Sequence, residues 1–145
     1  MDRIKLKVFG LSYQSMSQTG AYALILAEEN DAFRIPIIIG IAEAQSIAIQ
    51  LERVQTQRPL THDLIKTLAD ALNVALKEVF IYRLDAGIFY SELYFEIDKR
   101  IIKIDSRTSD AIALALRYDC PIYSTSEIIE KAGILVGQDV VAQEE

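Results

Sequence analysis

Three short runs of alternating apolar and polar residues constrain the fold more than any other feature of the sequence. The runs are Glu78–Leu84, Ile88–Ile97 and Arg100–Asp105, and only Asp85–Gly87 and Asp98–Lys99 separate them. Alternation with a period of two predicts strands that have one apolar face. Connections this short join antiparallel neighbours, because a parallel pair needs a crossover of about a dozen residues or more. We therefore predict an antiparallel meander.

The rest of the sequence switches between strand and helix periodicity, which is typical of strands and helices that share one core. We predict further strands at 3–9, 21–27, 33–39 and 121–123, an irregular segment at 10–20, and helices at 41–55, 61–73, 108–118 and 124–133. Pro36 cannot donate to a strand ladder, so we expect it at a sheet edge or a bulge. The predicted N-caps of the last three helices are Thr61, then Thr108 or Ser109, then Ser124.

Together these elements predict one α+β domain, with a mixed, largely antiparallel sheet and three to four helices packed on it. The domain is expected to span residues 1–135 and to precede a mobile acidic tail at 136–145. Hydrophobic residues make up 51% of 145 residues, which is enough for one sizeable core. The helix at 61–73 carries an apolar stripe of Leu64, Ile65, Leu68, Ala69 and Leu72.

Charge and cysteine content limit the classes of function. The net charge of −6 disfavours tight nonspecific binding to nucleic acid, although a local basic patch or a bound cation can still handle it. Cys120 is the single cysteine, so no internal disulfide forms, and we expect it to be a small buried side chain. The chain lacks an apolar run of membrane length and a signal-peptide pattern, which predicts a cytoplasmic protein without a membrane partner. One cysteine and one histidine exclude the common structural zinc sites.

The segment from Arg58 to Asp63 places the only histidine in the first turn of a predicted helix. Free N–H groups at a helix start attract anions such as phosphate, and Arg58 adds a planar donor group. Neutral His62 can act as a general base. The alternative is that Thr61 caps the helix, Asp63 complements its dipole and His62 is merely exposed. A Ser-His-Asp triad on His62 also stays open, although the sequence has no GxSxG motif.

A second polar cluster runs from Asp105 to Asp110 and is followed by Arg117. Asp105 and Asp110 are candidates to share a divalent cation, since Mg²⁺ prefers carboxylate and water oxygens. The alternative is simple N-capping, with the arginines paired to nearby carboxylates. Glu43 lies near the start of the helix at 41–55, where a carboxylate either complements the dipole or takes part in a site.

Taken in this order, the polar clusters resemble the bifunctional nuclease family. The matching stretches are Pro36–Ala44, Arg58–Leu64 (RPLTHDL), Gly87–Tyr90, Ile104–Arg117 (IDSRTSDAIALALR) and Pro121–Tyr123. The resemblance covers about 3–133 and implies hydrolysis of both RNA and DNA. It also implies a homo-oligomer, for which the Tyr90/Tyr94 face of the meander is a candidate. Where this chain has Thr108, the family often has proline.

The resemblance leads to a first hypothesis of metal-assisted phosphodiester hydrolysis, with Mg²⁺ or Mn²⁺ as the candidate cation. The catalytic candidates are His62, Asp63, Glu43, Asp105 and Asp110, and metal ligands are sought among Asp105, Asp110 and Glu43. Candidate substrate-binding residues are Arg58, Thr61, Arg107 and Arg117. A second hypothesis is a non-catalytic oligomeric module that uses these residues to bind an anion or a protein. In a third, the two polar segments only interlock to stabilise the fold.

Overall fold

The computed structural model describes residues 2–13, 21–30 and 32–136. Within them the strands are β1 (Ile4–Tyr13), β2 (Tyr22–Glu28), β3 (Phe33–Ile39), β4 (Ala75–Asp85), β5 (Ile88–Ile97), β6 (Arg100–Arg107), β7 (Ile122–Ser124) and β8 (Ile134–Leu135). The helices are α1 (Ile41–Leu51), α2 (Thr61–Ala71), α3 (Thr108–Tyr118) and α4 (Ser126–Ala132). The described strands form one sheet in the order β6-β5-β4-β7-β1-β2-β3-β8. The predicted α+β fold is confirmed.

The sheet is antiparallel except where β4 pairs with β7. The predicted meander is present as β4-β5-β6. Its turns place Ala86 and Gly87 at φ 52° and 79°, and Asp98 and Lys99 at φ 49° and 67°. Two consecutive left-handed residues are typical of tight hairpins, whose twist matches that of the strands they join. Pro36 lies on the part of β3 that β8 leaves unpaired, which confirms its edge position among the described residues.

Several predicted ends were wrong. β1 continues beyond Gly10 to Tyr13 because a bulge between Val8 and Gly10 lets the strand keep pairing with β2. α1 stops at Leu51 rather than near residue 55, and Arg53 just beyond it has a left-handed φ of 55°. β6 continues to Arg107 rather than ending at Asp105, and α3 starts directly after it. The two-residue strand β8 was missed.

The predicted N-caps are also displaced by one or two residues. The caps of α2, α3 and α4 are Leu60, Arg107 and Thr125. Thr108 is drawn into the first turn of α3 because its hydroxyl hydrogen-bonds Ser91 Oγ at 2.6 Å and donates to the Phe89 carbonyl. Thr125 takes the role predicted for Ser124, and its hydroxyl accepts from the Ile128 N–H.

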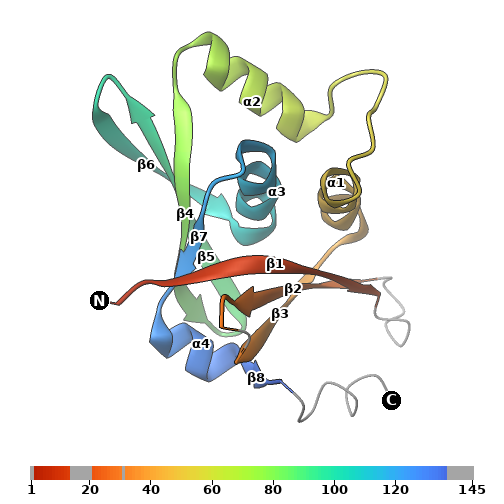
Figure 1. Cartoon of the computed structure of the whole chain (residues 1–145), viewed down its shortest axis with the longest axis vertical. Helices are drawn as coiled ribbons and strands as arrows, with labels where there is room; N and C mark the ends of the chain where they lie inside the picture. The colour runs from red at the N-terminus through yellow and green to blue at the C-terminus, as the bar shows by residue number, and fades with distance from the viewer. Residues whose placement is uncertain (1, 14–20, 31, 137–145) are drawn as a thin grey trace.

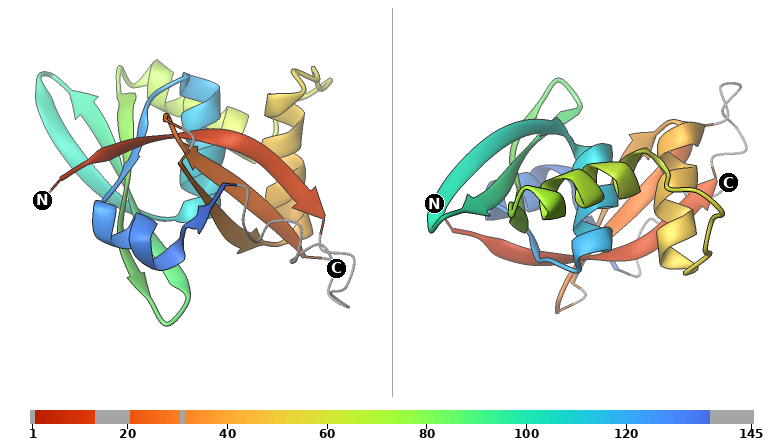
Figure 2. Two further views of the ribbon diagram at one scale, coloured as in Figure 1. Left: turned by 60° about the horizontal axis from the view of Figure 1, so that its bottom comes forward. Right: turned by 90° about the horizontal axis from the view of Figure 1, so that it is seen from above.

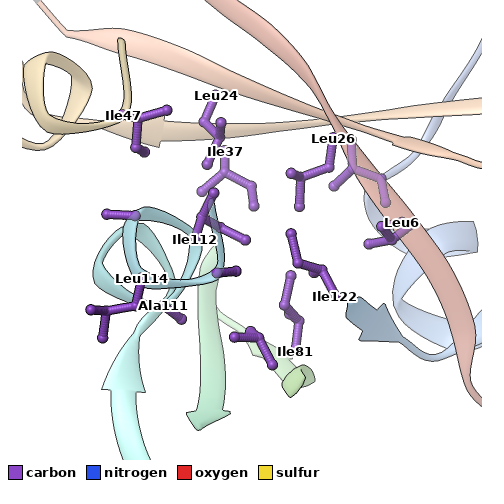
Figure 3. Close-up of a cluster of buried hydrophobic side chains, with 14 of the residues drawn as sticks. Leu6, Leu24, Leu26, Ile37, Ile47, Ile81, Ala111, Ile112, Leu114 and Ile122 are labelled. Atoms are coloured by element: carbon purple, nitrogen blue, oxygen red, sulfur yellow. The ribbon is translucent and has the colours of Figure 1, made fainter. Parts of the chain in front are cut away.

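Helix α3 occupies the centre of the molecule, between the sheet and helices α1 and α2 (Figures 1 and 2). Residues 111–115 are all buried, including alanines that let neighbouring elements approach closely. Ile112 packs among side chains of α1 and several strands, as Figure 3 shows. The start of α3 is therefore held rigidly, and this position matters for the polar residues described below.

Helix α2 is covered on one side only. His62 is its single buried residue, whereas Leu64, Leu68 and Leu72 are 60%, 59% and 62% exposed. The apolar stripe predicted from periodicity is therefore present, but its leucines face away from the core, whereas Ala69 packs against it. No helix in the described part of the chain is both long and apolar enough to cross a membrane.

Candidate functional site

Three helices bring together polar residues that lie far apart in the sequence. α1 carries Glu43 and Ser46, the first turn of α2 carries His62, and Arg107 and Asp110 lie at the start of α3. Both α1 and α2 pack against α3 (Figure 1). The packing joins the separate polar segments of the sequence into one hydrogen-bonded cluster, which we call the helix-junction cluster and define by these five residues.

His62 lies at the centre of the cluster and uses both ring nitrogens. Its Nδ1 is 2.8 Å from Ser46 Oγ, and its Nε2 is 2.9 Å from Asp110 Oδ1. A carboxylate can only accept a hydrogen bond, so Nε2 carries the proton. In the neutral ring Nδ1 is then an acceptor, and the Ser46 hydroxyl donates to it. The order Ser46–His62–Asp110 has the polarity of a catalytic triad, in which serine is linked through histidine to aspartate.

Asp110 is held from two sides. Arg107 Nε donates to Asp110 Oδ2 at 2.9 Å, while His62 holds the other oxygen. Burial favours the neutral acid and by itself raises the pKa of Asp110. The hydrogen bonds and charges of Arg107 and His62 outweigh this effect, so the pKa of Asp110 lies below its ordinary value. Asp110 is therefore a carboxylate at neutral pH and orients the imidazole.

Arg107 connects the cluster to solvent. Its side chain is 67% exposed, and its Nη2 lies 4.0 Å from Glu43 Oε1. The other Glu43 oxygen, Oε2, accepts the Gly40 N–H at 2.8 Å, which anchors the carboxylate at the start of α1. The guanidinium thus lies between two carboxylates and still presents N–H groups to solvent. This arrangement suits an arginine that binds an incoming anion.

Asp63 and Arg117 form a separate, more buried pair beside the cluster. Arg117 Nε donates to Asp63 Oδ1 at 2.7 Å, and the arginine side chain is only 3% exposed. Arg117 also donates to the carbonyls of Ala113 at 3.0 Å and Ser46 at 3.4 Å. Asp63 Oδ2 accepts the Leu60 N–H at 2.9 Å. This pair ties α1, α2 and α3 together, and Arg117 has little surface to offer a substrate.

Acid should weaken the Asp63 contribution to stability. Burial raises the pKa of Asp63, but the Leu60 N–H and Arg117 outweigh burial and hold it below the ordinary 3.8. A carboxyl whose pKa is lowered by folding stabilises the fold above its unfolded pKa and loses this effect as the pH falls through the folded value. We expect the stability gap between wild type and Asp63→Asn to be widest near neutral pH and to close below pH 3.8. Urea unfolding at several pH values measures the gap, and a gap that is independent of pH would contradict the assignment.

Besides Asp63 and Arg117, three further predicted site residues lie outside the cluster. Asp105 is opposite Glu92 on β5, whereas the neighbouring Ser91 faces α3. Successive strand residues point to opposite faces, so Asp105 lies on the far side of the sheet from Asp110. Asp105 approaches Tyr82 Oη there, at 3.5 Å. Arg58 and Thr61 are exposed near the start of α2.

The predicted set of metal ligands does not come together. Asp105 and Asp110 lie on opposite faces of the sheet, and the carboxylates of Asp110 and Glu43 are both directed at Arg107. Across residues 2–13, 21–30 and 32–136, no group of three or more His, Cys, Asp or Glu side chains is arranged to hold a metal ion. The residues present therefore do not fit a cation held by Glu43, Asp105 and Asp110.

Ser46 is the member of the cluster that the sequence reasoning did not select. Serine is common, and nothing adjacent to Ser46 marks it as reactive. One local signal was available, because Ser46 follows Glu43 by three residues and so lies on the same face of α1. Its contact with His62 depends on how α1 packs on α3, which no short segment of sequence encodes.

Cys120 is a partly buried side chain that packs against the core. Burial raises the pKa of its thiol to about 11 from the ordinary 9.0. Since the thiolate is the reactive form, we expect iodoacetamide to alkylate native Cys120 about a hundredfold more slowly at pH 8 than the urea-unfolded chain. Mass spectrometry of timed samples measures both rates. Equal rates in the two states would show that the thiol is exposed.

Comparison with known proteins adds to the geometry. Residues 24–137 match the family model of the bifunctional nuclease domain. An uncharacterized protein of Mycobacterium tuberculosis is 45% identical over 113 residues, which cover 78% of this chain and 67% of that protein. Bifunctional nuclease 1 of Oryza sativa subsp. japonica is 26% identical over 121 residues, which cover 81% of this chain but 37% of the rice protein. Because the matched range contains the whole helix-junction cluster, from Glu43 to Asp110, and most of the chain, the protein belongs to the bifunctional nuclease domain family.

Proposed function

We propose that this chain hydrolyses phosphodiester bonds in RNA or DNA at the helix-junction cluster. The observation that carries the proposal is the hydrogen-bonded series Ser46–His62–Asp110, which joins a hydroxyl, a base and an orienting carboxylate. The names of the family and of the rice relative suggest the substrate class. The cluster supplies the chemistry that such a reaction needs, namely an activated oxygen nucleophile and a cationic group beside it.

The geometry favours Ser46 as the nucleophile. Both nitrogens of His62 are already hydrogen-bonded, so the proton that His62 can accept is the one on Ser46 Oγ. In the first step the Oγ–P bond forms, the bond from phosphorus to the leaving oxygen breaks, and the proton moves to His62 Nδ1. The protonated imidazole then gives this proton to the leaving oxygen. Water cleaves the phosphoserine by the reverse route, and His62 again transfers the proton.

Arginines supply the positive charge that the phosphate requires. Arg107 lies beside Asp110 with a 67% exposed side chain, so its remaining N–H groups can reach a bound phosphate. Arg58 and Thr61 flank the N-terminal end of α2, where free N–H groups point outward, and both stay candidates for binding the substrate. A local site of this kind is compatible with the net charge of −6, because the rest of the surface need not bind nucleic acid.

The proposed reaction assigns no step to a cation. The predicted assistance by Mg²⁺ or Mn²⁺ required carboxylates that the fold keeps apart or pairs with Arg107. Glu43 is assigned instead to positioning Arg107, and Asp110 to orienting His62. Activity that disappears in EDTA and returns with added Mg²⁺ would restore the metal-assisted hypothesis and would require another set of ligands.

The Asp63–Arg117 pair favours the third hypothesis, in which polar residues only stabilise the fold, for part of the site. Asp63 and the buried Arg117 interlock three helices and offer little surface to a ligand. We therefore assign this pair to the fold and retain Ser46, His62 and Asp110 for chemistry. A non-catalytic module would use Arg107 to bind anions without turnover. A cleavage assay distinguishes this second hypothesis from the first.

The test is cleavage of end-labelled single- and double-stranded RNA and DNA by highly purified protein, with Mg²⁺, Mn²⁺ or EDTA. Ser46→Ala is compared with Ser126→Ala, a matched serine on α4 that is remote from the cluster. We expect wild type and Ser126→Ala to cleave and Ser46→Ala to be inactive. Internally labelled substrate should leave a phosphoserine on wild type after an acid quench. Full activity in Ser46→Ala would overturn the role of Ser46, and binding without cleavage by wild type would favour the non-catalytic module.

A further inference from the structure

We propose that the helix-junction cluster acts on single-stranded nucleic acid, whose bases beside the cleaved bond stack on Tyr90. This inference rests on the proposed function. The observation behind it is a row of three side chains, Arg107, Tyr90 and Arg83, that crosses β6, β5 and β4. Tyr90 lies opposite Arg107 on one side and opposite Arg83 on the other, and directly opposite residues of neighbouring strands share a face. Arg107 also belongs to the cluster, so the row begins at the proposed site of cleavage.

The two arginines of the row are exposed and yet held in place. The Arg107 side chain is 67% exposed, and its Nε donates to Asp110 Oδ2 at 2.9 Å. The Arg83 side chain is 57% exposed, and its Nη2 donates to Asp85 Oδ2 at 2.8 Å. Each carboxylate occupies only some of the guanidinium N–H groups, so the others can bind phosphates on both sides of Tyr90.

A bulge in β4 gathers two side chains against Tyr90. The register shifts between Ile81 and Arg83, so Tyr82 and Arg83 together lie opposite Tyr90. The centres of the Tyr82 and Tyr90 rings are 6.4 Å apart, and the Arg83 guanidinium is 4.9 Å from the centre of the Tyr90 ring. Both tyrosines are partly exposed. Unpaired bases stack on aromatic rings and on arginine planes, whereas bases in a duplex stack on each other, so the row favours a single strand.

A cavity continues the row beyond β4. Its volume is about 360 Å³, and Tyr82 and Arg83 form part of its lining together with residues of α4, which packs beside β4 (Figure 1). This volume lies within the range of about 300–1,000 Å³ that is usual for small-molecule sites. The lining includes Lys131, whose ammonium donates to Glu127 at 3.0 Å, and also Asp2. Because these carboxylates repel a phosphate, we assign the cavity to an uncharged base and the phosphates to the exposed arginines.

Charge confines the strand to the end of β5 that carries Tyr90. Tyr94 lies on the same face of β5, but its cross-strand neighbours are Lys103 and Glu78. Glu92 and Glu96 precede and follow it on that face, because successive residues of a strand alternate. The phosphates of a bound strand would meet three carboxylates there, whereas at Tyr90 they meet two arginines. Tyr94 is therefore a matched control for Tyr90.

The test measures binding separately from cleavage. A labelled oligothymidylate is titrated with the full chain carrying Ser46→Ala, and fluorescence anisotropy gives the dissociation constant. Adding Tyr90→Ala should raise this constant about 5- to 140-fold, which is the usual contribution of one stacked base. Tyr90→Phe keeps the ring and should restore binding, and Tyr94→Ala should bind like the parent chain. A duplex of the same strand should compete poorly, and circular dichroism confirms that all variants are folded.

Arg83→Met tests the phosphate contact at the far end of the row. The slope of log Kd against the logarithm of the salt concentration should fall by about 0.7, which is the contribution of one phosphate contact in a single strand. An unchanged slope would show that Arg83 binds no phosphate and would overturn the row.

Equal affinities of Tyr90→Ala and its parent, or of single strand and duplex, would overturn the inference. So would Tyr90→Ala that changes the oligomeric state in sedimentation but not the affinity for the oligonucleotide, because the ring would then belong to a contact between proteins. Failure of the proposed hydrolysis has a different signature. Binding that depends on Tyr90 without cleavage by wild type would retain the row and reject the hydrolysis. Cleavage by wild type with a KM that Tyr90→Ala leaves unchanged would retain the hydrolysis and reject the row.

Discussion

Replacing His62 with glutamine is expected to lower the rate of phosphodiester cleavage by about 10²- to 10⁴-fold, which is the usual contribution of a general acid–base group. Glutamine keeps hydrogen-bonding atoms between Ser46 and Asp110 but cannot accept the serine proton near neutral pH. The phosphoserine should fail to form because its first step needs that transfer. Single-turnover cleavage of labelled substrate, with the acid-quenched protein examined for bound label, measures both effects.

The control for His62→Gln is a pair of aspartate variants. Asp110→Asn removes the carboxylate that accepts from Nε2, so the imidazole can adopt the other tautomer and the rate should fall. Asp70→Asn changes an exposed carboxylate on α2 that pairs with Lys66, and it should cleave like wild type. Equal cleavage rates in wild type, His62→Gln and Asp110→Asn would indicate a contaminating nuclease or a different site.

Replacing Arg117 with methionine is expected to lower the free energy of unfolding by about 3 kcal/mol, because removal of one partner leaves a partly buried charge unpaired. Methionine retains much of the side-chain volume, so the loss reports the missing hydrogen bonds rather than a cavity. The affected groups are the Asp63 carboxylate and the carbonyls of Ala113 and Ser46. Because Asp63 is 35% exposed, water compensates part of the loss, and we place the effect at the low end for buried pairs. Urea unfolding followed by circular dichroism measures the difference.

Arg107→Met is the matched comparison, since Arg107 pairs with Asp110 in a similar geometry but is 67% exposed. An exposed ion pair contributes at most about 1 kcal/mol, so stability should change little while cleavage weakens. We therefore expect Arg117→Met to lower mainly the stability of the fold and Arg107→Met to lower mainly the rate of cleavage. Comparable destabilisation by both variants would assign Arg107 to the fold and would support the interlocking hypothesis for the whole cluster.

The sequence predicted most helices and strands well, because their formation depends on patterns among neighbouring residues. The period of two in the meander, the left-handed turns at Ala86 and Gly87, and the helical spacing of the later segments are all properties of a few adjacent residues. The errors lie at the ends of the elements, because contacts with residues distant in the sequence determine where a strand or helix begins and ends. Leu11 and Tyr13 stay in β1 only because β2 pairs with them, and Thr108 is pulled into α3 by Ser91.

The site was harder to predict because its geometry is tertiary. His62, Glu43, Arg107 and Asp110 were selected from the sequence, and the structure brings these four together. Asp105 lies on the other face of the sheet from Asp110 because successive residues of β6 alternate. The predicted strand ended at Asp105, so this alternation could not be followed to the start of α3. Arg117 was expected to face a ligand, but it turns toward Asp63 on another helix.

Strand β7 gives the molecule an order of assembly. β1, β2 and β3 can pair with near neighbours in the chain, and so can β4, β5 and β6. Among the described strands, β7 alone joins these two halves, by adding Ile122–Ser124 between β4 and β1. A chain emerging from the ribosome therefore needs Ile122–Ser124 before the sheet can close between β4 and β1, and long-range closure of this kind is slow. Until β7 is added, the two parts of the sheet that carry the helix-junction cluster are linked, among the described residues, only through the packing of α1 and α2 on α3.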